Sequence, residues 1–152
     1  MNVPVKSKTI VAARPLAGRV SLVTGSTSGI GLGIACALAA AGSEIILNGF
    51  GSPENIAEAQ AQIASEFNVR VLYSPTDMSK PVSIRKMIET TLESFGRLDV
   101  LVNNAGIQHV APLQEFPPEK WDAILAINPI VGVSYVSFCI AFDARSQMGP
   151  HH

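Results

Sequence analysis

The sequence predicts an α/β fold in which helices cover both faces of a parallel sheet, and two observations support this prediction. Short runs that are apolar almost throughout, which is typical of strands buried on both faces, alternate with longer runs of helical periodicity. A glycine-rich turn at residues 24–31 joins the first strand-like run to the first helix-like run. Right-handed crossovers between such strands give a doubly wound sheet, whose ligands bind at the carboxyl ends of the strands.

From residue 20 onward we expect four strands that alternate with four helices. The predicted strands are residues 20–23, 44–48, 69–73 and 98–103. Residue types that favour helix starts precede the later three helices: Ser52 with Pro53, Ser79, and Pro117 with Pro118. The first helix, residues 29–41, ends at Gly42, and the third ends at Gly96, because glycine tolerates the left-handed conformation that terminates helices.

Composition restricts the class of protein. The chain has 152 residues, 47% apolar and 15% charged, which suits one domain or part of a larger one. A net charge of -1 provides no electrostatic attraction to nucleic acid or to an anionic membrane. The apolar stretch at residues 29–47 is interrupted at Gly42 and is too short to span a bilayer. Cys36 and Cys139 lack metal-ligand spacing, so we expect no metal, free thiols and a cytoplasmic location.

The first 15 residues carry Lys6, Lys8 and Arg14 and no acidic residue. This composition is faintly similar to a transit peptide, but neither a long apolar core nor an amphipathic pattern supports one. We therefore expect residues 1–15 to be a disordered leader, or the product of a misplaced start codon.

The glycine-rich turn has the composition of a nucleotide-binding site. Thr24 and Gly25 end the first strand, and the following helix begins around Gly29 and Gly31. Glycines let the backbone turn sharply and approach a ligand, while a helix N-terminus offers N–H groups to a pyrophosphate. We expect a side chain at any of these three glycines to occupy the space of the pyrophosphate. The alternative is a tight connection without a ligand, since the spacing differs from the common G-x-G-x-x-G fingerprint.

Three ordered motifs resemble the short-chain dehydrogenase/reductase family, and the resemblance covers residues 16–128. The motifs are Thr24-Gly25-x-x-x-Gly29-x-Gly31, then Asp77-Met78 after the third strand, and Asn103-Asn104-Ala105-Gly106 after the fourth. The resemblance implies a Rossmann-type sheet that binds NAD. It also implies a set of cofactor contacts: Thr24, Gly25, Ser28, Gly29, Ile30, Gly31, Phe50, Asp77, Met78, Asn104, Ala105 and Gly106.

Within this family the sequence is similar to the 3-hydroxybutyrate dehydrogenases. The similar stretches are residues 24–33, 47–51, 103–109 and 119–126. The resemblance implies that NAD oxidises a small 3-hydroxy acid, 3-hydroxybutyrate, to acetoacetate, with Gln108 holding the substrate carboxylate. It leaves His109 undecided between this role and that of an exposed loop residue. Full-length members are homo-oligomers, and the oligomeric state of this chain stays open.

Charge decides the expected choice of cofactor. A 2′-phosphate calls for Arg or Lys after the second strand, and residues 48–51 contain neither. The carboxylate that usually selects NAD is also missing there, whereas Phe50 is placed to pack near the adenosine. We therefore expect NAD, selected because the phosphate of NADP would find no partner.

The proton-transferring residues of the family are not found. Asn128 matches the catalytic asparagine, but the family's serine and Tyr-x-x-x-Lys have no match, because Asp77 follows Tyr73 and Cys139 follows Tyr135 at the lysine position. We therefore expect the chain as written to be inactive. The alternatives are a non-catalytic NAD-binding fragment, a pseudogene product, or an unrelated interaction protein, which the three ordered motifs disfavour.

Residues 129–152 no longer resemble the family, and Pro129 interrupts the helix that the family continues there. If residues 129–152 are back-translated and the reading frame is moved forward by one base, the result can encode a sequence similar to that of the family after the asparagine. We therefore expect a frameshift near codon 128 or 129, which truncates the sheet after its fourth strand. A naturally divergent tail is the alternative.

Overall fold

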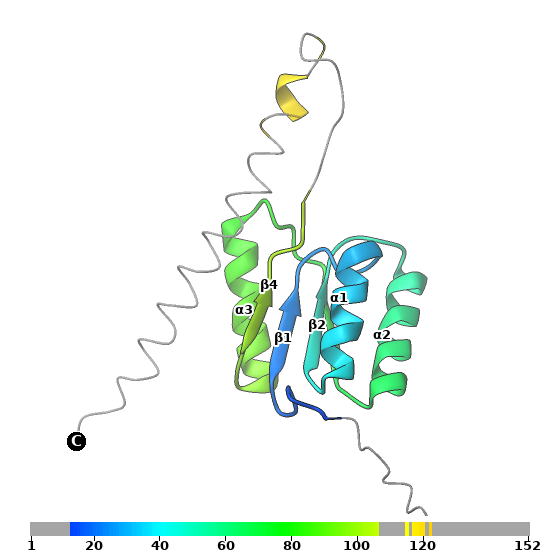
Figure 1. The fold of residues 1–152 in the computed structure, drawn as a ribbon. Helices are drawn as coiled ribbons and strands as arrows, with labels where there is room; N and C mark the ends of the chain where they lie inside the picture. Colours follow the sequence, from blue (N-terminus) through cyan, green and yellow to red (C-terminus); the bar gives the residue numbers. More distant parts are fainter. Residues whose placement is uncertain (1–12, 107–114, 116, 121, 123–152) are drawn as a thin grey trace, which may run out of the picture.

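The computed structural model describes residues 13–106, 115, 117–120 and 122. Within these residues four strands alternate with three helices (Figure 1). The strands are β1 (Val20–Val23), β2 (Glu44–Asn48), β3 (Val71–Ser74) and β4 (Val100–Val102). The helices are α1 (Gly29–Ala40), α2 (Pro53–Phe67) and α3 (Pro81–Phe95).

The strands pair in the order β3-β2-β1-β4, and every pair is parallel. The chain moves outward from β1 through β2 to β3 and then crosses to the other side of β1 to form β4. The order therefore reverses between β1 and β4, which is where doubly wound sheets bind their ligands. The predicted Rossmann-type parallel sheet is confirmed, and its glycine-rich turn lies beside this reversal.

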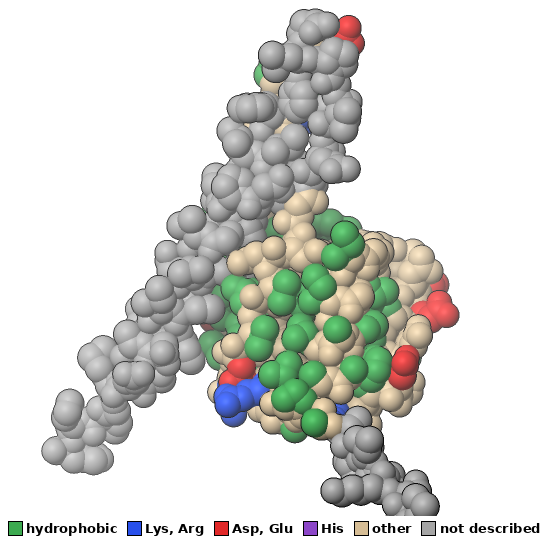
Figure 2. Space-filling view, viewed as in Figure 1, with side chains coloured by type: hydrophobic (Ala, Val, Ile, Leu, Met, Phe, Trp, Pro, Cys, Tyr) green, Lys and Arg blue, Asp and Glu red, His purple; other side chains and the backbone are tan. Residues whose placement is uncertain are grey.

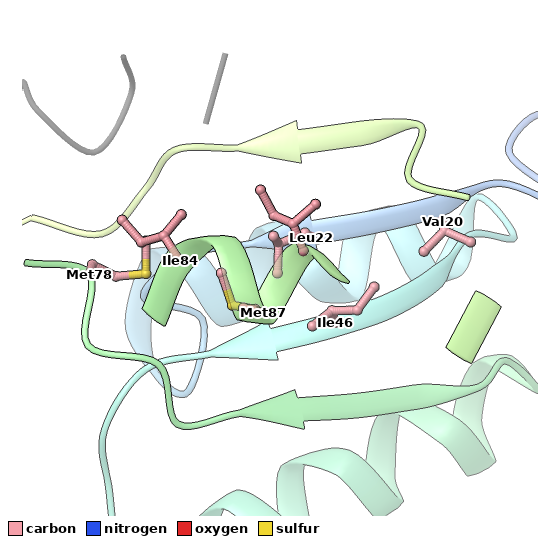
Figure 3. Close-up of a cluster of buried hydrophobic side chains, with 7 residues drawn as sticks. Val20, Leu22, Ile46, Met78, Ile84 and Met87 are labelled. Carbon is pink, nitrogen blue, oxygen red and sulfur yellow. The ribbon is translucent and has the colours of Figure 1, made fainter. Parts of the chain in front are cut away.

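Helices cover both faces of the sheet, with α1 and α2 on one face and α3 on the other (Figure 1). On the α3 face, Leu22 and Ile46 belong to a buried cluster with Met87 of α3 (Figure 3). On the opposite face, Val23 and Leu47 are fully buried in a second cluster, with side chains of α1 and α2. Since successive strand residues point to opposite faces, the strands must be apolar on both sides, as the sequence predicts.

Helix α1 is apolar around its whole circumference. It contains no charged residue, and its side chains Leu32, Ile34 and Leu38 are only partly buried. Hydrophobic side chains gather on the face of the described part that Figure 2 turns toward the viewer, with few charged groups among them. Among the described residues, no helix combines the length and the apolar character needed to cross a membrane.

The two inner strands have the predicted bounds, whereas β3 and β4 are shorter than predicted. Val69 precedes β3 and Leu98 precedes β4, yet both pack in the core. Their apolar character therefore reflects burial and not a place in the strand ladder. This is why an apolar run overestimates the length of these two strands.

Helix ends follow the predicted residues with one exception. The Ser52 hydroxyl accepts a hydrogen bond from Asn55 N (3.2 Å), and Gly42 and Gly96 have φ angles of +100° and +75°. The prediction that Ser79 caps α3 is wrong, because the helix begins at Pro81 and Lys80 takes the cap position. Of the predicted fourth helix, the structure describes a helical turn at residues 118–120, and residues 123–125 lie outside the described part.

Candidate functional site

Thr24 joins the turn after β1 to the segment after β4. This residue is fully buried. Its Oγ1 accepts hydrogen bonds from the backbone nitrogens of Asn104 (3.0 Å) and Ala105 (2.8 Å). Its own N–H donates to the Val102 carbonyl (3.0 Å). These hydrogen bonds therefore fix the turn after β1 relative to the segment after β4, the two strands between which the strand order reverses.

The side chain of Asn104 completes this connection. Its Nδ2 donates to the carbonyl oxygens of Thr24 (2.9 Å) and Gly25 (3.0 Å). A Cβ at Gly31 would lie 2.2 Å from the Gly25 carbonyl oxygen, and a Cβ at Gly25 would lie 2.9 Å from Cα of Ala105. Packing within the protein thus requires both glycines. A side chain at Gly25 or Gly31 would therefore meet protein atoms, and the expectation that it would also fill the space of a ligand stays a prediction.

Gly29 is the glycine of the turn that faces open space. Its φ is +57°, and a Cβ there would meet no atom within 4 Å. Ser28 and Ile30 beside it are exposed, and no side chain caps α1. The N–H groups of the first helical turn, which have no partner within a helix, therefore lie at an open and electrically positive end. This arrangement fits a pyrophosphate.

Two large apolar side chains are exposed to solvent near the N-terminal end of α1. Ile30 is 80% exposed and Phe50, in the loop after β2, is 70% exposed. The Thr27 hydroxyl donates to the Phe50 carbonyl (2.7 Å), and this bond ties the loop to the glycine-rich turn. The Phe50 ring therefore offers an apolar surface beside the turn, of a kind that fits the flat face of an adenosine.

The two residues predicted after β3 differ in what they can offer a cofactor. The Met78 side chain is buried in the core, so its backbone is the part that a cofactor can contact. Asp77 accepts hydrogen bonds from the hydroxyl (2.7 Å) and the N–H (2.9 Å) of Ser79. These bonds, with a smaller contribution from Lys80 at 3.4 Å, hold the pKa of Asp77 below its usual range. Asp77 is therefore an ionised acceptor.

Sequence reasoning missed Ser26 and Asn48, which are both fully buried. The Ser26 hydroxyl donates to the Val23 carbonyl (2.6 Å) and accepts from Asn48 N (3.0 Å). For Asn48 the available signal was a polar residue at the end of an apolar strand, because a buried polar side chain must find partners.

A groove of about 420 Å³ opens between β3 and α3. Leu72 and Met87 contribute apolar lining, and Lys80 and Lys86 contribute positive charge. The groove includes Asp77 but no residue of the glycine-rich turn. It therefore borders the predicted site without containing it.

Several predicted residues remain untested by this geometry. Gly106 is exposed at the end of the described segment. Gln108, His109 and Asn128 lie outside the described residues. Among the residues that the structure describes, no three His, Cys, Asp or Glu side chains gather as a metal site.

Comparisons with known proteins show the family to which the chain belongs. A family model described as short chain dehydrogenase matches residues 19–142. A protein of Cupriavidus necator named D-beta-hydroxybutyrate dehydrogenase is 57% identical over 114 residues, which are 74% of this chain and 43% of the relative. A protein of the same name from Rhizobium meliloti is 47% identical over 110 residues, 72% of this chain and 43% of the relative. The chain therefore spans less than half the length of these relatives.

A solved structure has the same arrangement of elements. This is the structure of a short chain dehydrogenase from Burkholderia cenocepacia in complex with NADP, which matches with a TM-score of 0.78 and 32% sequence identity. The matched region covers 84% of this chain and 51% of the Burkholderia chain. The family match continues beyond residue 128 to residue 142, so it includes part of the predicted tail; the origin of that tail stays a prediction. Because the match takes in most of the sequence, the chain belongs to the short-chain dehydrogenase family of oxidoreductases.

Proposed function

We propose that this chain binds NAD at the open end of α1 and forms the cofactor-binding part of a D-3-hydroxybutyrate dehydrogenase. The observation that carries the proposal is the positive φ of Gly29 in front of open space. Exposed Ile30 and Phe50 beside it offer an apolar surface that the described part of the chain leaves uncovered. A pyrophosphate on the helix end and an adenosine against Phe50 explain both features.

The remaining contacts follow from the same placement. We assign the ionised Asp77 carboxylate to the adenine amino group, since it accepts hydrogen bonds. Met78, Ala105 and Gly106 would contribute through their backbones. Thr24 and Asn104 would support the cofactor site indirectly, because their side chains hydrogen-bond to the protein backbone. When bound, NAD accepts a hydride from the secondary alcohol carbon of the substrate.

The preference for NAD over NADP is part of the proposal. Residues 48–51 contain no Arg or Lys that would pair with a 2′-phosphate. Asn48 is buried and its amide bonds the protein, so it is not free to contact the ribose. The related structure from Burkholderia cenocepacia contains NADP, which makes a direct comparison of the two cofactors necessary.

We propose further that Gln108 holds the substrate carboxylate and that Asn128 has the catalytic role of the family asparagine. This chain on its own is proposed to be inactive. Tyr73 is not a proton-transferring tyrosine, because its hydroxyl donates to the Gly49 carbonyl (2.8 Å) and no lysine follows it at the required spacing. The second candidate function is a non-catalytic NAD-binding module with a cytoplasmic location. It is supported by the glycine-rich turn and the open end of α1, which need no catalytic residue to bind NAD.

The test has two arms. Titration calorimetry of the purified chain with NAD and NADP should show binding of NAD and weaker binding of NADP. An assay for NADH formation from D-3-hydroxybutyrate should show no turnover, because the chain lacks the proton-transferring pair. Absence of NAD binding by a folded chain would contradict the cofactor site, and turnover would contradict the proposed inactivity.

A further inference from the structure

Asn48 occupies the last position of β2, in the middle of the carboxyl edge of the sheet. Strand β1, with the glycine-rich turn, lies on one side of β2, and β3, with the loop that carries Asp77, lies on the other. Asn48 is fully buried. A polar side chain at such a position can be tolerated only when its donors and acceptor are satisfied.

The amide of Asn48 bonds both neighbouring segments. On the β1 side, its Oδ1 accepts from Gly25 N (3.4 Å). On the β3 side, its Nδ2 donates to the carbonyl oxygens of Ser74 (3.1 Å) and Thr76 (3.0 Å). One side chain thus connects the turn proposed for the pyrophosphate to the loop proposed for the adenine.

The backbone of the same residue reinforces the first of these connections. Asn48 O accepts from Ser26 N (2.6 Å), and Asn48 N donates to the Ser26 hydroxyl (3.0 Å). The turn is therefore bonded to the end of β2 through main-chain and side-chain groups. Of the two Nδ2 bonds, the one to Ser74 meets the last residue of β3, and the one to Thr76 meets the loop that follows it.

The partners also determine the chemistry that the position requires. Two carbonyl oxygens need donors and one N–H needs an acceptor, and a primary amide provides both kinds of group. A carboxylate has the same shape, but it would place negative charge against the carbonyl oxygens of Ser74 and Thr76. It would keep the bond to Gly25 and lose the bonds to the loop.

We propose that Asn48 is a positioning residue that sets the separation between the pyrophosphate-binding turn and the adenine-binding loop. The proposal rests on the NAD site proposed above. A dinucleotide must contact both segments at once, so its affinity depends on their separation, whereas a ligand of one segment is indifferent to it. The effect of a substitution should therefore depend on the length of the ligand.

The experiment compares Asn48→Asp with the unmodified full chain, using NAD, adenosine and pyrophosphate as separate probes. NAD affinity should fall by about tenfold, the equivalent of one hydrogen bond between charged or buried groups. The affinity for pyrophosphate, which meets only the glycine-rich turn, should change by less than about twofold. The affinity for adenosine, which meets Phe50 and Asp77, should fall less than the affinity for NAD. Asn68→Asp, an identical change at the exposed far end of α2, should leave all three affinities unchanged.

The outcomes are distinguishable. If the unmodified chain binds no NAD, the proposed function fails. If it binds NAD and Asn48→Asp binds NAD equally well, or if all three affinities fall together, the positioning role is overturned. Should Asn48→Asp not fold, nuclear magnetic resonance of the unmodified chain decides. Adenosine should then shift the Asn48 side-chain amide and Gly25 N–H resonances, and an unmoved Gly25 resonance would overturn the proposal.

Discussion

The Oγ1 of Thr24 lies 2.8 Å from the backbone nitrogen of Ala105, a residue 81 positions further along the chain. The same oxygen accepts from Asn104 N. These bonds join the ends of β1 and β4, the strands between which the sheet order reverses. Hydrogen bonds therefore connect the glycine-rich turn after β1 to the segment after β4.

Replacing Thr24 by Val should test this connection. The change keeps the shape of the side chain but removes the acceptor of the Ala105 N–H, whereas the Asn104 N–H keeps its bond to the Val102 carbonyl (3.1 Å). We expect the free energy of unfolding to fall by about 1 kcal/mol, the cost of one half-buried donor without its partner, as measured by urea denaturation. Thr24→Ser retains the oxygen and serves as the control. Equal stability of the Val and Ser variants would contradict this role.

Gly29 and Gly31 should respond differently to the same substitution. Gly29→Val should abolish NAD binding in calorimetry while leaving the circular dichroism spectrum largely intact, because its Cβ would meet no atom within 4 Å. The φ of +57° disfavours a β-branched residue there, so the variant should also lose some stability. Gly31→Val should disrupt folding, because its Cβ would lie 2.2 Å from the Gly25 carbonyl oxygen. If a folded Gly29→Val chain bound NAD with unchanged affinity, the proposal that the pyrophosphate binds at Gly29 would be wrong.

Phe50 should contribute to binding and not to stability, since its side chain is 70% exposed. Phe50→Ala should weaken NAD binding by roughly tenfold, the equivalent of about 1.4 kcal/mol of lost aromatic contact. Its unfolding midpoint should stay unchanged. Val82→Ala, at an 82% exposed position on α3, is the matched control, and an equal loss of affinity there would show that the effect is not local.

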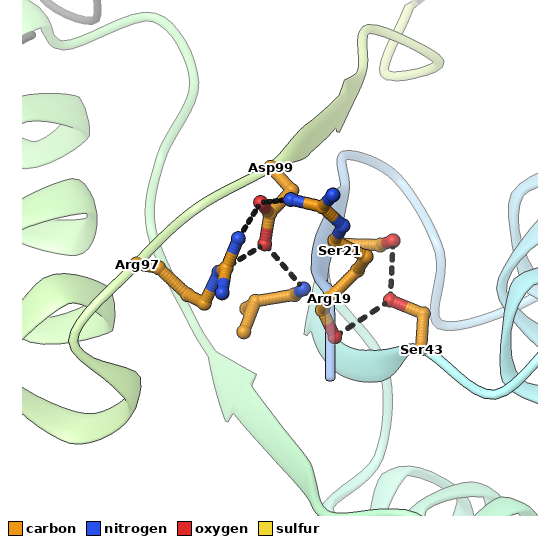
Figure 4. Close-up of polar contacts among 6 residues, drawn as sticks. Arg19, Ser21, Ser43, Arg97 and Asp99 are labelled. Carbon is orange, nitrogen blue, oxygen red and sulfur yellow. Dashed lines mark hydrogen bonds and ion pairs between the residues drawn. The ribbon is translucent and has the colours of Figure 1, made fainter. Parts of the chain in front are cut away.

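Asp99 should make stability depend on pH in the acid range. Its carboxylate accepts hydrogen bonds from Arg97, from Val20 N and from Arg19 (Figure 4). These bonds, those of Arg97 first, lower the pKa of Asp99 from 3.8 to about 2. A lowered folded pKa means that the stabilisation is complete above pH 3.8 and is lost as the pH falls toward about 2.

Urea denaturation between these two pH values checks this prediction. The unmodified chain should lose stability as the pH falls, and Asp99→Asn should lose less, because an amide does not titrate in this range. Glu58→Gln, on an exposed position of α2, should keep the slope of the unmodified chain. If the stability of Asp99→Asn fell with pH as steeply as that of the unmodified chain, the pH dependence would come from other carboxylates.

The proposed frameshift makes a prediction about the gene. Deleting one base at the codon 128–129 junction should open a longer reading frame that encodes a serine and a Tyr-x-x-x-Lys. Its product should reduce NAD with D-3-hydroxybutyrate, and Gln108→Ala in that product should weaken substrate use more than NAD binding. An immediate stop codon, or a frame without Tyr-x-x-x-Lys, would refute the frameshift.

Much of the fold follows from local sequence patterns. Apolar runs located β1 and β2 to the residue, and Ser52, Gly42 and Gly96 mark helix ends as predicted. Local patterns suffice here because caps and left-handed glycines act on neighbouring residues. Patterns were less reliable for β3 and β4, since burial makes residues apolar whether or not they pair in a strand.

The sequence by itself therefore determined the order of strands and helices, the position of the glycine-rich turn and the family. Only the tertiary structure decided what individual site residues do: Gly25 and Gly31 make room for Asn104, Gly29 faces open space, and Asn48 bridges two loops. These roles rest on hydrogen bonds and close contacts between residues that are far apart in the sequence. No local pattern encodes such distances, because they arise when β2 pairs between β1 and β3 and β4 returns to the other side of β1.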